Sequence, residues 1–231
     1  MRDLSGRDDM TIAIPDLEEL SSVSARFEDA SASQIIQWAH DNFGDGLVLA
    51  ASFQDCVLID IAATAVPDVE VVFLDTQYHF EETLAYVETI RERYDLNLTV
   101  MHPEIEPDDL WKADTDKCCA LRKVEPLARA LEGKAAWMTG LRRADAPSRA
   151  GAQIVGFDVG RGLVKINPIA TWTDLDVQGY TSDRELPVHP LANEGFPSIG
   201  CSPCTKLVAD GEHPRSGRWA GTDKIECGLH D

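Results

Sequence analysis

Four short apolar runs recur along the chain between segments of helical character, and this alternation most restricts the fold. The runs cover residues 47–51, 71–74, 96–101 and 135–139. The run at residues 47–51 is continuous, as is typical of a strand that is buried on both faces of a parallel sheet. Strands that alternate with helices predict right-handed crossover connections. We therefore expect an α/β fold in which helices flank a parallel sheet.

The segments between the runs carry apolar residues at helical spacing. Ile35, Ile36 and Ala39 form one such stripe, which ends at Gly44. Further helices are expected over residues 57–62, 80–94, 115–131 and 173–182, and a hairpin is expected over residues 153–167. We divide the chain into a loosely ordered lead-in (1–30), an α/β domain (31–200) and a C-terminal arm (201–231).

Polar residues follow two of the apolar runs. Ser52 and Asp55 come after the first run, and Asp75 comes after the second. The carboxyl ends of parallel strands face one crevice, where the N–H groups of the following helix suit phosphate or sulfate. An ordinary Ser or Asp helix cap accounts for the same residues.

Three arginines stand in a loop that contains glycine and proline, directly after the fourth run. They are Arg142, Arg143 and Arg149. Guanidinium groups pair with phosphate or sulfate oxygens through two parallel hydrogen bonds, so the loop is a candidate anion clamp. A solvated charged loop is the alternative.

The formal net charge of the chain is −19, and its distribution limits the possible partners. The first 110 residues hold 5 Lys and Arg against 24 Asp and Glu, whereas the rest of the chain holds 16 of each. This acidic first half argues against nucleic acid as a partner but leaves room for a small anion bound by the arginines of the second half. We find no leader and no apolar run that would span a membrane, which favours a cytoplasmic protein.

Four of the six cysteines lie in two close pairs along the sequence, Cys118 next to Cys119 and Cys201 three residues before Cys204. A zinc site is the commonest use of four cysteines. Adjacent helical residues point about 100° apart, however, and do not easily share one tetrahedral ion. A [4Fe-4S] cluster accepts diverging ligands and is therefore favoured, with a disulfide between Cys118 and Cys119 as a weaker alternative.

Cys227 lies four residues from the C-terminus and has few apolar neighbours in the sequence. Such a residue cannot fill a core, so it is either an incidental surface thiol or a reactive cysteine on a mobile arm. A reactive cysteine needs cations nearby, because positive charge stabilises the thiolate and attracts an anionic substrate.

Residues 45–231 resemble the bacterial assimilatory adenylyl-sulfate (APS) reductases, relatives of the phosphoadenylyl-sulfate (PAPS) reductases. The motifs that carry the resemblance are Ser52-Phe53-Gln54-Asp55, Leu74-Asp75-Thr76, Lys117-Cys118-Cys119-x-x-Arg122-Lys123, Thr139-Gly140-Leu141-Arg142-Arg143, Cys201-x-x-Cys204-Thr205, Gly217-Arg218-Trp219 and Lys224-x-Glu226-Cys227-Gly228-Leu229-His230. The terminal Glu-Cys-Gly-Leu-His together with the two cysteine pairs is the most specific part.

The resemblance implies an adenine-nucleotide α-hydrolase-like fold with a pyrophosphatase loop, and it implies that Cys227 is the nucleophile. Phe53 and Gln54 replace the glycine pair of ATP-cleaving relatives, which argues against ATP hydrolysis. The residues implied to line the substrate pocket are Ser52, Phe53, Gln54, Asp55, Asp75, Lys123, Arg142, Arg143, Arg215 and Arg218. The cluster ligands would be Cys118, Cys119, Cys201 and Cys204.

The implied reaction reduces APS to sulfite and AMP in sulfate assimilation. Cys227 would attack the sulfur of APS to form an S-sulfocysteine, which thioredoxin or glutathione thiols would resolve. The cluster would position Lys123 and tune the electrostatics around the sulfate. A reductase that prefers or also accepts PAPS is one alternative, and a zinc-stabilised nucleotide-binding module without turnover is another. A homo-oligomer is compatible with the sequence.

Overall fold

The computed structural model describes residues 16–230, and its centre is a sheet of six strands in the order β3-β2-β1-β4-β6-β5. The pairs β2–β3, β1–β2, β1–β4 and β4–β6 are parallel, whereas β5 and β6 form an antiparallel hairpin. The strands are β1 (Leu47–Ala51), β2 (Glu70–Leu74), β3 (Leu98–Met101), β4 (Ala136–Thr139), β5 (Val155–Asp158) and β6 (Leu163–Ile166). The predicted parallel α/β sheet and its hairpin are confirmed.

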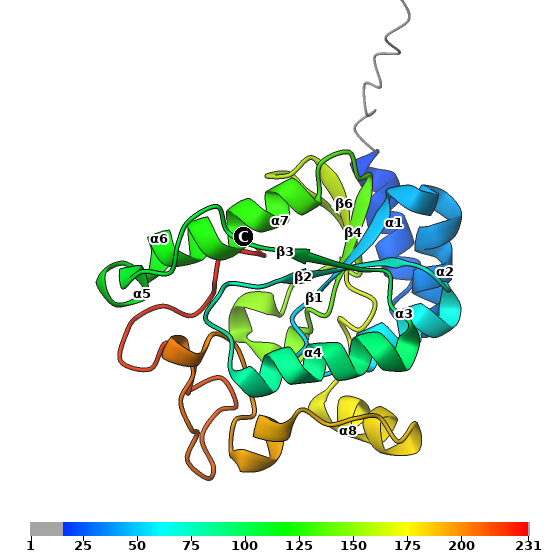
Figure 1. The fold of residues 1–231 in the computed structure, drawn as a ribbon. Coiled ribbons are helices and arrows are strands. Elements are labelled where there is room, and N and C mark those ends of the chain that lie inside the picture. Colours follow the sequence, from blue (N-terminus) through cyan, green and yellow to red (C-terminus); the bar gives the residue numbers. More distant parts are fainter. Residues whose placement is uncertain (1–15, 231) are drawn as a thin grey trace, which may run out of the picture.

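Helices cover both faces of the sheet, with α3 and α4 on one side and α6 and α7 on the other (Figure 1). The α-helices are α1 (Leu17–Arg26), α2 (Ala32–Phe43), α3 (Val57–Ala65), α4 (Glu81–Tyr94), α5 (Leu110–Ala113), α6 (Thr115–Cys119), α7 (Glu125–Ala130) and α8 (Asp174–Asp183). Short 3-10 turns cover Gly44–Gly46, Arg143–Asp145, Pro147–Arg149, Pro190–Glu194 and Ser202–Cys204. The helix predicted over residues 115–131 is interrupted by a π-helical turn, Ala120–Val124.

The prediction of a loosely ordered lead-in is wrong for residues 17–26, which form helix α1. Asp16 caps this helix by accepting the N–H groups of Glu18 and Glu19. Leu20 and Val23 are buried on one face, and the Ser24 hydroxyl accepts the N–H of Ile154 at 3.0 Å beside β5. Two apolar residues three positions apart were too weak a stripe to reveal this helix. Residues 1–15 of the lead-in lie outside the described part of the chain.

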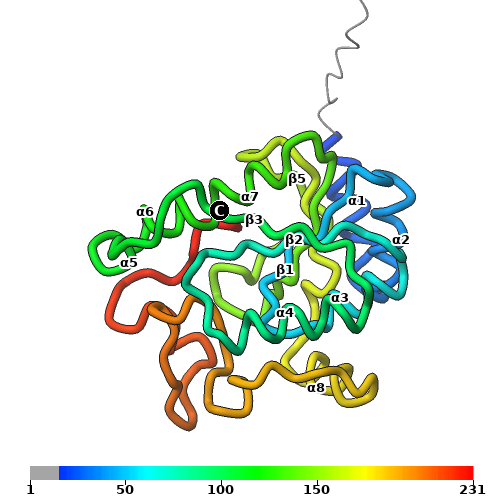
Figure 2. Tube along the Cα trace, in the orientation of Figure 1, coloured from blue at the N-terminus to red at the C-terminus, as the bar shows by residue number. Residues whose placement is uncertain are grey.

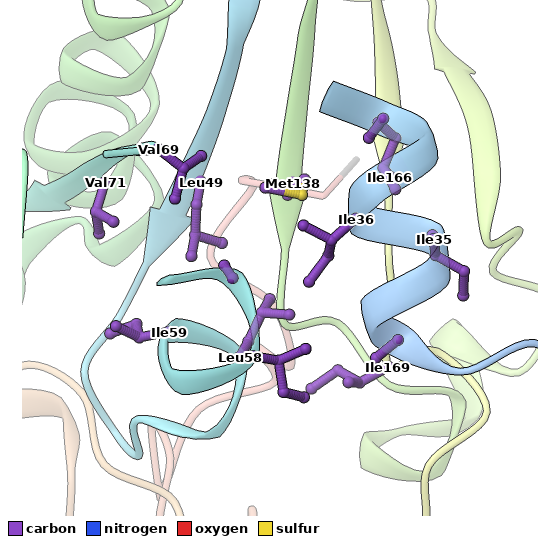
Figure 3. Packing of buried hydrophobic residues seen from close by; sticks show 14 of the residues in the cluster. Ile35, Ile36, Leu49, Leu58, Ile59, Val69, Val71, Met138, Ile166 and Ile169 are labelled. Carbon is purple, nitrogen blue, oxygen red and sulfur yellow. The ribbon is translucent and has the colours of Figure 1, made fainter. Parts of the chain in front are cut away.

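Side chains alternate between two cores of very different size, one on each face of the sheet. Leu49, Met138 and Ile166 point into the larger one, where helices α2 and α3 pack against them (Figure 3). The smaller core consists of Val48, Val72, Leu127, Leu131, Trp137 and Leu163, with Leu229 from the end of the chain packed against it. The smaller core lies beneath α7.

The strand order places the carboxyl ends of β1 and β4 side by side. From β1 the chain proceeds outward to β2 and β3, and it then crosses over to β4 on the other side of β1. Such a reversal opens a crevice at the strand ends, which is where ligands bind in open α/β sheets. Within residues 16–230, no helix is both long and apolar enough to cross a membrane.

Candidate active site

The loop after β1 leaves Ser52 and Asp55 exposed. Phe53 turns inward at φ 54° and meets Phe73 edge to face, with the ring centroids 5.3 Å apart. The Asp55 carboxylate accepts the N–H of Val57, the first residue of α3, at 3.0 Å, although the N-cap position itself is Cys56. Desolvation by the surrounding protein raises the pKa of Asp55, although Val57 and Arg142 act against this shift.

Gln54 ties this loop to the segment that precedes Cys201. Its side-chain oxygen accepts the N–H of Ile199 at 3.0 Å. Arg218 donates to the Ile199 carbonyl at 3.3 Å, and a Cβ at Gly200 would collide with its guanidinium. Residue 200 therefore has to be glycine if Arg218 is to lie against this backbone.

The loop after β4 separates the three arginines that the sequence grouped together. Arg142 pairs with Asp145 at 2.7 Å and with Asp174 at 2.9 Å, and it remains near Asp55. Arg143 instead donates two hydrogen bonds to Glu28 in the turn after α1, both at 2.7 Å. The structure therefore does not bring Arg143 to the predicted substrate residues, because the Glu28 carboxylate holds its guanidinium elsewhere.

All four paired cysteines border one hollow. Cys118 and Cys119 come from the end of α6, whereas Cys201 and Cys204 come from the turn after residue 200. The Cys201 sulfur lies 3.2 Å from the Thr76 hydroxyl. Burial raises the pKa of Cys118 to about 11, with the other three thiols adding to the shift.

The π-helical turn lies directly after these two cysteines and carries Arg122 and Lys123. π-Helical turns are rare in proteins, and those that occur are often found at functional sites. Arg122 is 1% exposed, and it donates to the Gln77 side chain and to the Glu106 carbonyl, both at 2.6 Å. Arg122 thus anchors the helix that carries the cysteines to the loop after β2, a role that the sequence reading did not identify.

Cys227 lies among cations. Lys123, Lys224 and Arg149 each interact electrostatically with Cys227. Lys123 also interacts electrostatically with Cys201, one of the cysteines that border the hollow. Lys123 therefore interacts with both the candidate nucleophile and the cysteine hollow. The surroundings that a reactive thiol needs are therefore present.

The C-terminal arm lies docked against the domain and returns beneath α7 (Figure 2). Glu226 accepts hydrogen bonds from Arg149 at 2.8 and 2.7 Å and from Arg215 at 3.2 Å. Leu229 packs on the smaller core, and His230 stacks on Trp137 with ring centroids 6.1 Å apart. Arg149 and Glu226 were absent from the predicted pocket, although each lies in a motif or loop that the sequence singled out.

Lys123 borders the hollow, and Asp75 and Arg218 are sequence neighbours of Thr76 and Trp219, which also border it. The Asp75 carboxylate accepts the N–H of Gln77 at 2.8 Å and lies 3.5 Å from His102. The Arg218 guanidinium lies over the Trp219 ring, 4.7 Å from its centroid, and Trp219 borders the hollow.

Residues 46–207 match the family model of the phosphoadenosine phosphosulfate reductase domain. The chain belongs to this family. An adenosine 5'-phosphosulfate reductase of Mycobacteroides abscessus is 47% identical, over 93% of this chain and 96% of that protein. One of Mycolicibacterium smegmatis is also 47% identical, over 90% of this chain and 91% of that protein. The resemblance identified from the motifs is thereby confirmed.

Solved structures agree with this family assignment. The phosphate complex of a PAPS reductase from Candida auris superposes with a TM-score of 0.74 at 25% identity, covering 84% of this chain and 98% of that one. An FMN adenylyltransferase from Candida glabrata superposes with a TM-score of 0.60 at 14% identity, covering 81% of this chain and 65% of that one, a likeness of fold alone. The family fold is thus shared with enzymes that handle adenine nucleotides.

Proposed function

We propose that the protein reduces adenosine 5'-phosphosulfate to sulfite and AMP in sulfate assimilation. The relatives that match over nearly the whole chain bear the name of this activity. The observation that carries the proposal is the placement of Cys227, which directly follows a glutamate bound to Arg149 and Arg215 and interacts electrostatically with Lys123 and Lys224. A thiol in this position can attack an anionic sulfur compound, because the cations compensate the negative charge of the thiolate and that of the substrate.

We assign a [4Fe-4S] cluster to Cys118, Cys119, Cys201 and Cys204, because four thiols are a suitable donor set for it. Four thiols from two distant segments border one space, yet within residues 16–230 no group of three or more Cys, His, Asp or Glu is arranged to hold a single metal ion. A cluster accepts ligands at separate corners, which suits this spread better than one zinc ion does. When bound, the cluster would supply a fixed charge beside Lys123 and join α6 to the arm.

The chain's own residues account for a balanced first step. The Cys227 thiolate forms a bond to the sulfur of APS while the bond from that sulfur to the phosphate oxygen breaks, so AMP leaves with the electron pair. Lys123 and Lys224 offset the charge that the sulfonate brings. We assign Arg142, Arg215 and Arg218 to the anionic groups of the nucleotide, and we assign Ser52, Phe53, Gln54, Asp55 and Asp75 to the crevice that receives it.

A second thiol completes the reaction. Thioredoxin or glutathione would attack the Cys227 sulfur, release sulfite and form a mixed disulfide, and a further thiol would reduce that disulfide. The arm would have to open for this step, because a protein reductant needs access to Cys227. Such thiol donors are kept reduced in the cytoplasm, which we propose as the location of the enzyme.

The test is the intact mass of anaerobically purified protein after mixing with APS in the absence of reductant, followed by peptide mapping. We expect one added sulfonate on the peptide that contains Cys227 and its loss when thioredoxin is added. Cys227→Ser should gain no sulfonate. Cys56→Ala is the matched control, because Cys56 is buried at the start of α3 and should not affect the adduct.

Other outcomes would contradict parts of the proposal. An adduct with PAPS but not with APS would change the substrate to that named for the Candida auris structure. No adduct with either nucleotide, on protein that contains zinc and no iron or sulfide, would indicate a binding module without turnover.

A further inference from the structure

The residue before the nucleophile candidate has a contact of its own to the domain. Both carboxylate oxygens of Glu226 engage Arg149, and one of them also receives a hydrogen bond from Arg215. The side chains of Glu226, Arg149 and Arg215 are 14%, 11% and 18% exposed, so this contact is largely shielded from water. A bidentate, shielded pair of this kind has a more specific geometry than an ion pair on the surface and is less screened by salt.

The two arginines belong to a cationic group that needs an anion. Arg215 lies near Arg149 and Arg218, and burial together with these two cations lowers its pKa. Asp145 already binds Arg149 at 3.0 Å and Arg142 at 2.7 Å from the side of the loop. Glu226 of the arm supplies the further negative charge that offsets Arg149 and Arg215.

Carboxylate, phosphate and sulfate groups bind guanidinium through the same two-pronged geometry. Glu226 therefore fills donors that suit an anionic ligand equally well. Arg215 is among the residues we assign to the nucleotide, so the arm and the ligand have a donor in common. Leu229 and His230 hold the arm by apolar contacts, which an anion cannot replace.

We propose that Glu226 is an internal competitor for the substrate's anion site. Its carboxylate binds Arg149 and Arg215 while the site holds no ligand, and a phosphate or sulfate group of the ligand displaces it. Displacement loosens the arm at Cys227, while Leu229 and His230 keep the end of the chain docked. This inference rests on the proposed function, because it takes Arg215 as a ligand of the nucleotide's anionic group.

The consequence is a coupling between ligand and arm. AMP that stays bound after the first step keeps Glu226 displaced, so the S-sulfocysteine is exposed to a thiol reductant. Once AMP leaves, Glu226 rebinds the arginines and the arm closes. The carboxylate thus holds Cys227 in its half-buried position in the resting enzyme.

Two measurements on the cluster-containing enzyme test the competition without turnover. The first is the affinity for AMP, and for inorganic sulfate, by calorimetry. Glu226→Gln should bind AMP about tenfold more tightly than the wild type, because a competing charge is removed. The second is the rate at which iodoacetamide alkylates Cys227 in the ligand-free enzyme, which should rise severalfold in the same variant.

Two further variants make the result specific. Glu226→Asp keeps the charge but shortens the reach to Arg149, so it should fall between the wild type and Glu226→Gln in both measurements. Asp116→Asn removes the other ion pair of the arm, between Lys224 and an Asp116 side chain that is 86% exposed. It should leave the affinity for AMP unchanged, because that pair does not involve Arg149 or Arg215.

The outcomes separate this inference from the proposed function. Unchanged or weaker binding of both AMP and sulfate by Glu226→Gln would overturn the competition, as would an unchanged rate of alkylation. Glu226→Gln could bind sulfate more tightly while neither it nor the wild type binds AMP. That result would contradict the proposal of a nucleotide substrate but would support the competition at the anion site. Whether Cys227 acquires a sulfonate from APS is decided separately.

Discussion

The two faces of the sheet are built differently. One face packs against α2, α3 and α4 and forms the larger core, whereas the other is covered by α7 and closed by Leu229 near the end of the chain. The fold therefore depends chiefly on the first face, while the second holds the cysteine helix and the docked arm (Figure 1). Completing the smaller core and placing Cys227 are one event, because Leu229 stands two residues after it.

The largest effect should come from a change that leaves both cores intact. Cys227→Ser should lower the rate of sulfite formation from APS by about a thousandfold or more, because serine cannot supply the thiolate. The thermal midpoint should stay within about 2 °C of the wild type, since the residue fills no core. Steady-state assays and calorimetry check the pair of values, and substantial activity in this variant would remove Cys227 from the mechanism.

The next largest effect is expected from shortening a side chain in each of the two cores, because the two losses of stability should differ. Met138→Ala, in the larger core at 0% exposure, should lower the free energy of unfolding by about 2–5 kcal/mol. Leu229→Ala should lower it by less than about 2 kcal/mol, because this side chain is only partly buried.

The activities should rank in the opposite order. Folded Met138→Ala should keep most of its turnover, whereas Leu229→Ala should lose turnover and expose Cys227 to alkylation. Denaturant titration and assays at a temperature where both variants are folded provide the comparison. Equal losses of stability would mean that the two faces are not different in the way described.

The buried carboxylate of Asp60, beside the larger core, should make a smaller, pH-dependent contribution to the free energy of unfolding. Burial alone would raise the pKa of Asp60, but hydrogen bonds from Tyr180, Arg184 and Tyr94 lower it overall. A lowered folded pKa means that the stabilisation is present above the unfolded value of about 3.9 and is lost as the pH falls through the folded value.

Asp60→Asn should therefore reduce the free energy of unfolding by about 1–3 kcal/mol near neutral pH. The difference from the wild type should shrink below about pH 4, as chemical denaturation at several pH values would show. Glu226→Gln is the control on the other face and should keep the acid dependence that Asp60 causes. A difference that does not vary with pH would contradict the ionised state of Asp60.

The smallest effect is expected for Arg143. Its pair with Glu28 is partly exposed, so Arg143→Ala should cost less than about 1 kcal/mol of stability and alter the KM for APS by no more than about twofold. Arg142→Ala should raise that KM about tenfold or more, because Arg142 remains at the crevice. A large KM effect at Arg143 alone would restore the assignment that the sequence suggested.

Local patterns were sufficient for most of the fold. Runs such as residues 47–51 and stripes such as Ile35, Ile36 and Ala39 predicted strands and helices that the structure contains, because periodicity reports burial directly. Helix α1 and the π-helical turn were not predicted. The first has a short apolar stripe, and the second depends on packing around Arg122 rather than on its own residues.

The sequence by itself determined the sheet, the family and the candidate nucleophile, since each rests on neighbouring residues or short motifs. Only the tertiary structure decided which arginines meet which acids. Arg143 pairs with a glutamate 115 positions away, and Arg149 pairs with one 77 positions away. A long guanidinium side chain binds whichever carboxylate the fold places within its reach, and nothing in the local sequence specifies that partner.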